Sequence, residues 1–182
     1  MDKFYYIVSQ LPTLFYDKES FMTIDRFMEE AGKWLAHRDY RILSKIDMND
    51  TSQDMEGPRL WRDYRAFEKR FREDLAAWRK SLRSGQEYKP VHFPSSLVNE
   101  GNPLEVEKKL LEYRWNTIEA WEREHDFDLE FLILYLLKLQ ILQRLASFNK
   151  DKGMEVFQEV VNIHLDDLEA EREKVESPDD VH

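Results

Sequence analysis

Cysteine is absent from this sequence of 182 residues. Disulfide bonds, zinc sites with thiolate ligands and cysteine nucleophiles are therefore excluded. The absence also suits a reducing compartment, because disulfides persist mainly in oxidising ones.

Glycine and proline are scarce, with five and six residues, which fits a chain with few turns. The sequence also lacks a Gly-rich phosphate-binding loop, a nucleophile elbow and an HExxH zinc motif. Because no familiar catalytic motif is present, we expect a protein that is not an enzyme and that uses no cofactor.

Positive charge is in deficit, since 37 acidic residues against 27 basic ones give a net charge of -10. This balance argues against general nucleic-acid binding, which relies on a basic surface. The opening residues, MDKFYYIVSQLPTL, hold an apolar patch that is shorter than the roughly 7–15 residues of a secretory signal. We therefore expect a cytoplasmic, unprocessed protein.

The longest apolar run covers residues 128–148, DLEFLILYLLKLQILQRLASF. No proline or glycine interrupts it, so a run of this length predicts a helix. A helix that is apolar almost all round must be covered on most sides. Glu130, Lys138 and Arg144 break the run short of the roughly 20 apolar residues of a membrane span. The predicted fold is all-α, an elongated helical bundle around this central buried helix, with no direct membrane span.

Two further helices are predicted before residue 85. Thr23 suits the N-cap of the first, which continues briefly from Asp39. Its inward positions recur at spacings of three and four: Ile24, Phe27, Met28, Ala31, Trp34 and Leu35. The second covers residues 58–84 and ends at Gly85, with a seam of Leu60, Tyr64, Phe67, Phe71, Leu75, Trp78 and Leu82. Residues 4–8 could form a short strand, but we favour an extended segment or a partial helix.

The outer face of the predicted helix at residues 58–84 is basic. It carries nine basic side chains against four acidic ones, Asp63, Glu68, Glu73 and Asp74. The simplest interpretation is a solvated face that the acidic loop and tail partly neutralise. The functional interpretation is a docking surface for an acidic partner, because opposed charges guide association. Its candidate partner-binding residues are Arg62, Arg65, Arg72 and Arg79. RNA binding ranks below both, given the overall acidity.

The second half of the chain follows a connection at residues 86–101, which leaves a two-lobed bundle open. Asn102, Pro103 and Glu105 form a strong helix start. We expect this helix to run to about His125, to leave Trp115 exposed, and to form an antiparallel hairpin with the central helix. A last helix follows the turn NKDKG. The predicted organisation is a single helical domain over residues 1–170 and an acidic, disordered tail over residues 171–182.

Two acidic patterns could hold metal ions. Glu122 and His125 have the E-x-x-H spacing of di-iron bundles, but the second pair that such a site needs is missing. Asp166 and Asp167 suggest magnesium, but only residues 179–180 could supply a second acidic motif. A solvated helix end is the simpler interpretation of both patterns. We therefore expect no metal site and no catalytic residue.

Two stretches resemble known families. The opening, FYYIVSQLPTLFYD followed by SFMTIDRFME and HRDYRIL, resembles a little-characterised bacterial family whose genes typically sit among those for a bacterial V-type ATPase. Residues 129–153 look like the C-terminal repeat of the V-type ATPase C subunit (the d subunit of eukaryotes), with matches at Tyr135, Leu136, Leu137, Lys152 and Gly153. Unlike the C subunit, this chain lacks a clear threefold repeat and an Ala-Arg-Val-Arg run near its start.

The resemblance implies a non-catalytic, cytoplasmic accessory or central-stalk component of a bacterial V-type ATPase, similar to the C subunit. Such a component docks to other protein subunits at the inner face of the membrane. A general helical adaptor or scaffold unrelated to rotary ATPases is the main alternative. A helical enzyme that uses carboxylates and a metal ion is less favoured.

Overall fold

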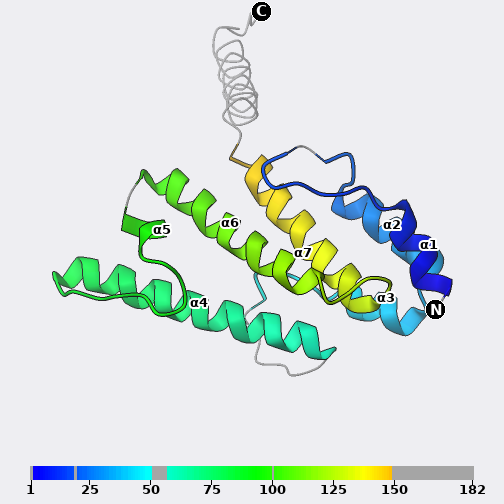
Figure 1. The fold of residues 1–182 in the computed structure, drawn as a ribbon, viewed down its shortest axis with the longest axis horizontal. Helices are drawn as coiled ribbons and strands as arrows, with labels where there is room; N and C mark the ends of the chain where they lie inside the picture. The colour runs from blue at the N-terminus through cyan, green and yellow to red at the C-terminus, as the bar shows by residue number, and fades with distance from the viewer. Residues whose placement is uncertain (1, 19, 51–56, 100, 149–182) are drawn as a thin grey trace, which may run out of the picture. The chain divides into compact units, whose positions relative to one another are not determined.

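The computed structural model describes residues 2–18, 20–50, 57–99 and 101–148. These residues contain seven helices joined by loops. Figure 1 shows their order: α1 (Asp2–Gln10), α2 (Ile24–Trp34), α3 (His37–Leu43), α4 (Arg59–Ser84), α5 (Ser96–Asn99), α6 (Pro103–Glu122) and α7 (Leu129–Ala146). These residues contain no strand, so the all-α prediction is confirmed. None of the seven helices is both long enough and apolar enough to cross a membrane.

The chain divides into two compact units, Met1–Arg144 and Leu145–His182. The first holds α1 to α6 and most of α7, whereas only residues 145–148 of the second are described. The predicted last helix, the acidic tail and the Asp166–Asp167 pair lie outside the described residues. The single domain over residues 1–170 and the two-lobed arrangement stay predictions.

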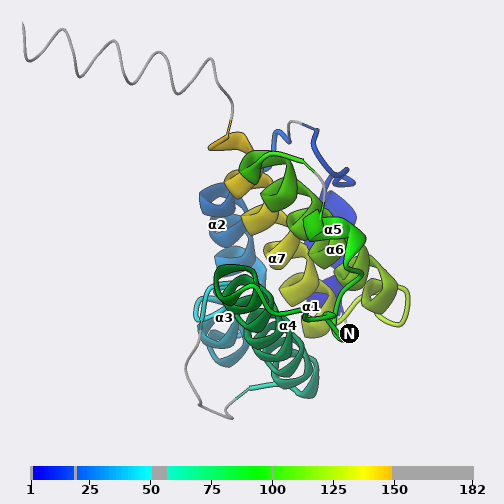
Figure 2. The same ribbon diagram turned by 90° about the vertical axis from the view of Figure 1, so that its left-hand side faces the viewer.

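Helix α7 is buried along most of its length. Every residue from Leu132 to Leu139 is buried, including the charged Lys138. The carboxylate of Asp128 accepts a hydrogen bond of 2.7 Å from the backbone N–H of Phe131, which satisfies a donor in the first turn. Figures 1 and 2 show α7 between α6 on one side and α2 on the other. Neighbouring helices therefore cover the apolar side chains of α7 on both sides.

Side-chain hydrogen bonds tie the N-terminal third of the chain to α7. The hydroxyl of Tyr135 donates to the backbone carbonyl of Pro12 at 2.9 Å. The amide of Gln140 donates to the carbonyl of Ile46 at 2.8 Å and accepts from the N–H of Met48 at 2.7 Å. These bonds fix the loops before α2 and after α3, where the backbone has no helical partners of its own.

Residues 4–8 are helical and lie inside α1, so the partial helix is confirmed, and the strand and the extended segment are wrong. Exposed rings from three parts of the chain form a surface row: Phe127 lies 5.3 Å from Tyr5, and Tyr6 stacks on Trp34 at 5.2 Å. Trp34 is 37% exposed, so its predicted inward position is wrong. The reason is that α2 ends at this residue and its ring turns to the surface to meet Tyr6.

Helix α4 ends as predicted, because Gly85 adopts a left-handed φ of 66° that closes the last turn. Its buried side is rotated from the predicted seam. Leu82 is 61% exposed, whereas Trp61 is buried. Glu68 and Asp74, predicted on the outer face, are also buried. The prediction was wrong for these acids because each has hydrogen-bonding partners on another segment, which hydrophobic spacing cannot indicate.

Helix α6 begins with the predicted capping box between Asn102 and Glu105. It lies between α4 and α7 in Figure 1. Because α6 is covered on both sides, Trp115 is only 2% exposed, and its predicted exposure is wrong. Ion pairs join α6 and α7 in opposite chain order, from Glu119 to Lys138 and from Glu107 to Arg144. The two helices are therefore antiparallel, as predicted.

Candidate functional site

Of the two patterns considered for metal binding, only Glu122 and His125 lie in the described part of the chain. Glu122 pairs with Lys138, whereas Nδ1 of His125 lies 2.8 Å from the carboxylate of Asp128. The E-x-x-H pair thus has two separate structural partners. No group of three or more His, Asp or Glu side chains that could hold a metal ion occurs among the described residues.

The four arginines predicted to bind a partner differ in their surroundings. Arg62 and Arg79 are exposed. The side chain of Arg65 is only 12% exposed, and its guanidinium lies 3.7 Å from the carboxylate of Asp50. Arg72 is half-buried and donates to Glu68 at 2.5 Å. Two of the four therefore stabilise the fold and two lie at the surface, so the structure does not bring them together as one site.

A buried ion pair joins α4 to α6. Arg114 donates to both carboxylate oxygens of Glu68, from Nε and from Nη2, each at 2.9 Å. The guanidinium also lies 4.3 Å from the centre of the Phe71 ring. A bidentate pair of this kind fixes distance and orientation together, so it sets how α4 and α6 face each other.

A second buried acid holds the loop after α4. The carboxylate of Asp74 accepts hydrogen bonds from the N–H of Val91 at 2.7 Å, the N–H of His92 at 2.6 Å and the hydroxyl of Tyr88 at 2.5 Å. Burial raises the pKa of Asp74, but these three donors outweigh it and hold the pKa below its ordinary value. The loop is thus fixed against the helix, with Val91 and His92 at a defined position.

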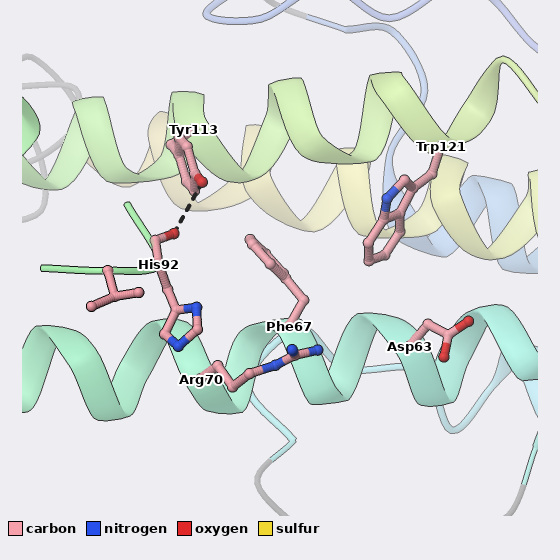
Figure 3. Close-up of a pocket in the computed structure, with 7 residues that line it drawn as sticks. Asp63, Phe67, Arg70, His92, Tyr113 and Trp121 are labelled. Atoms are coloured by element: carbon pink, nitrogen blue, oxygen red, sulfur yellow. Dashed lines mark hydrogen bonds between the residues drawn. The ribbon is translucent and has the colours of Figure 1, made fainter. Parts of the chain in front are cut away.

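These elements line an open groove of about 450 Å³, which we call the aromatic groove (Figure 3). Helix α4, the loop and α6 line it with Asp63, Phe67, Arg70, Val91, His92, Tyr113 and Trp121. The three α4 residues follow the i, i+4, i+7 spacing of one helix face. The hydroxyl of Tyr113 donates to the carbonyl of His92 at 3.0 Å, which joins the loop to α6.

The aromatic groove has apolar walls and different charges at its two ends. The ring of Phe67 lies 6.3 Å from that of Tyr113 and 6.0 Å from that of Trp121. Figure 3 shows Arg70 extending from beside His92 to below Phe67, and Asp63 below Trp121. Such a combination of aromatic faces and a few polar groups is typical of binding sites.

Arg70 is the cation of the groove that has no acidic partner in the described part of the chain. Its Nε donates to the backbone carbonyl of Ala66 at 3.1 Å, which leaves the terminal nitrogens for another acceptor. Asp63, by contrast, lies 3.6 Å from Arg59. The sequence prediction named neither Arg70 nor the aromatic residues as a site. The i, i+4, i+7 spacing was visible in the sequence, but the residues of the loop and of α6 that complete the groove were not.

Part of the chain is similar to a known family model. Residues 96–167 match the model of a family described as a protein of unknown function (DUF2764). The match includes α5, α6 and α7, and therefore the α6 wall of the aromatic groove, but not α4. No curated protein and no solved structure matches the chain.

Proposed function

We propose that this protein is a non-catalytic docking protein of the cytoplasm whose partners are subunits of a bacterial V-type ATPase. The aromatic groove is the observation that supports docking. It combines apolar walls with the guanidinium of Arg70, which has no ion pair among the described residues. The resemblance of residues 4–14 and 129–153 to families linked with V-type ATPases supports the choice of partner.

The surface charge of α4 favours an acidic partner. Its exposed residues include two acids, Asp63 and Glu73, and seven bases, Arg59, Arg62, Lys69, Arg70, Arg79, Lys80 and Arg83. This positive face belongs to a chain with a net charge of -10. Such a local excess steers an acidic surface towards α4 and disfavours basic ones.

Native mass spectrometry tests the proposal on complexes that are gently isolated from the source cell through a tag on the full chain. Recovery of V-type ATPase subunits supports it. Central-stalk subunits alone would indicate a coupling position similar to that of the C subunit, whereas intermediates without the membrane ring would indicate an assembly factor. Recovery of the protein without any component of the ATPase would contradict the proposed partner.

A general helical adaptor is the second candidate. The exposed aromatic row of Tyr5, Tyr6, Trp34 and Phe127 favours it, because this surface comes from other elements than the groove. Tyrosine and tryptophan are enriched at the centres of protein interfaces, so the row is a second place for a partner. In the same isolation, stable partners unrelated to rotary ATPases would favour the adaptor.

A further inference from the structure

We infer that the aromatic groove binds an acidic amphipathic helix of the partner, with one large apolar side chain packed against the rings of Phe67 and Trp121 and a carboxylate on Arg70. This inference rests on the proposed docking function and specifies the chemistry of the segment that docks. It is carried by the length of the groove, its charges and its uncovered apolar rim.

The length of the groove suits a helix. Asp63 and Arg70 are seven residues apart on α4, which corresponds to about 10 Å along the axis. This distance spans about two helical turns, the repeat over which a bound helix presents anchors at i, i+3, i+4 and i+7. The walls come from two antiparallel helices, since Phe71 stacks on Tyr113 while Phe67 contacts Trp121.

The charges of the groove select an acidic segment. The side chain of Arg70 begins beside His92 and extends towards Phe67, and its terminal nitrogens carry no ion pair within the described residues. A guanidinium in this position can bind a carboxylate through two parallel hydrogen bonds. At the other end Asp63 already has Arg59 as a partner, so it repels an approaching acid less than a free carboxylate would.

The rim of the groove exposes apolar side chains that an apolar side chain of the partner can cover. Val91 is 80% exposed although its backbone is held firmly by Asp74. Phe67, Tyr113 and Trp121 are only partly covered by the chain itself. An apolar side chain of a partner would remove these surfaces from water, which is the arrangement of an interface hot spot.

A direct test uses fluorescence anisotropy with the full-length protein. The probe is a fluorescein-labelled helical peptide of alanine and glutamate with one central phenylalanine. We expect saturable binding to wild type, and weaker binding of two comparison peptides, one with alanine in place of phenylalanine and one with glutamine in place of glutamate. Arg70→Glu should weaken binding of the probe at least about tenfold, because it places like charges together.

Arg26→Glu is the matched control, since Arg26 is exposed on α2, which does not line the groove. It should change binding less than about twofold. Three results would overturn the inference: no binding of the probe to wild type, equal losses in the two variants, or equal binding of the peptide without phenylalanine. Both variants should melt like wild type, because both arginines are exposed.

The test separates this inference from the proposed function. If Arg70→Glu abolishes probe binding but the wild-type chain isolates no component of the ATPase, the groove chemistry stands and the ATPase partner is wrong. If ATPase subunits are isolated equally with wild type and Arg70→Glu, the docking function stands and the groove is not the docking surface.

Discussion

Glu68 is a carboxylate buried between two arginines. Replacing it with glutamine keeps its shape but leaves the guanidinium of Arg114 buried without a counter-charge. We expect Glu68→Gln to lower the free energy of unfolding by about 3–5 kcal/mol, measured by urea denaturation. Glu73→Gln is the control, since Glu73 is exposed on the same helix. This substitution should lower the free energy of unfolding by less than about 0.5 kcal/mol. Equal, small losses would show that the buried pair contributes nothing to stability.

Asp74 should make stability depend on pH. Asp74→Asn removes the negative charge that three donors stabilise and keeps only one acceptor oxygen, so we expect a loss of about 1–3 kcal/mol near neutral pH. The pKa of Asp74 is lowered by folding, so its stabilisation is fully present above the ordinary value of 3.8 and is lost as the pH falls through the lower folded value. The difference in unfolding free energy between wild type and variant should therefore narrow only below about pH 4. A difference that stays constant down to pH 2 would contradict this assignment.

Glu68 and Asp74 also show a limit of prediction from the sequence at the scale of single residues, because their burial was not predicted. Both were assigned to a solvated face because charged side chains are rarely buried without partners. Their partners, Arg114 and the N–H groups of Val91 and His92, lie 17 to 46 residues away. No spacing rule within one helix indicates such contacts, so the error follows from information that only the fold supplies.

At the scale of elements, the start of α6 offers a quantitative test. Asn102 accepts from the N–H of Glu105 at 3.0 Å, and the Glu105 carboxylate accepts from the N–H of Asn102 at 3.2 Å. Asn102→Ala should cost about 1 kcal/mol of unfolding free energy, while Asn102→Ser should retain most of the stability. Thermal denaturation of wild type and the two variants measures this difference in stability. Equal losses of stability for the alanine and serine variants would exclude a capping role for Asn102.

Helix α7 should be the element least tolerant of substitution. Leu137 is buried, so Leu137→Ala should lower the unfolding free energy by about 2–5 kcal/mol. Leu137→Asp should abolish folding, because an unpaired buried charge exceeds the stability of an ordinary domain. Leu82→Ala, at an exposed position of α4, is the control and should be nearly neutral. Circular dichroism of Leu137→Asp that matches wild type would contradict the burial of this helix.

Helix ends were predictable because their signals are local. Thr23, Gly85 and Asn102 each act within one turn of their own helix, and all three cap as predicted. Helix faces were less predictable because they depend on neighbours. Trp115 was assigned to the outside since a single apolar face was assumed, whereas α6 contacts α4 on one side and α7 on the other.

At the scale of the whole molecule, surface charge should govern partner binding without affecting the fold. Arg62 and Arg79 are the two exposed members of the predicted set, so Arg62→Glu with Arg79→Glu should melt like wild type. We expect this variant to lose partner proteins in the isolation described above, because reversal of two charges removes the electrostatic steering of α4.

Arg26→Glu with Arg38→Glu provides the matched control, since both residues are exposed and lie on α2 and α3. It changes the net charge equally and should leave the partners bound. Equal losses in the two double variants would show that overall charge, and not the α4 face, determines association. Arg65 is unsuitable for this test, because its side chain is largely buried, with the guanidinium over the Trp61 ring and near Asp50.

The hydrogen bonds between α7 and the first third of the chain have a consequence for synthesis. They join residues 92 to 123 positions apart in sequence. The ribosome synthesises α1, α2 and α3 long before α7. These helices therefore leave the exit tunnel before α7, the helix against which they pack, has been made. Folding of this unit therefore waits until translation has passed residue 140. Until then the nascent chain exposes the apolar faces of its first helices, and chaperones that bind exposed apolar surfaces can bind there.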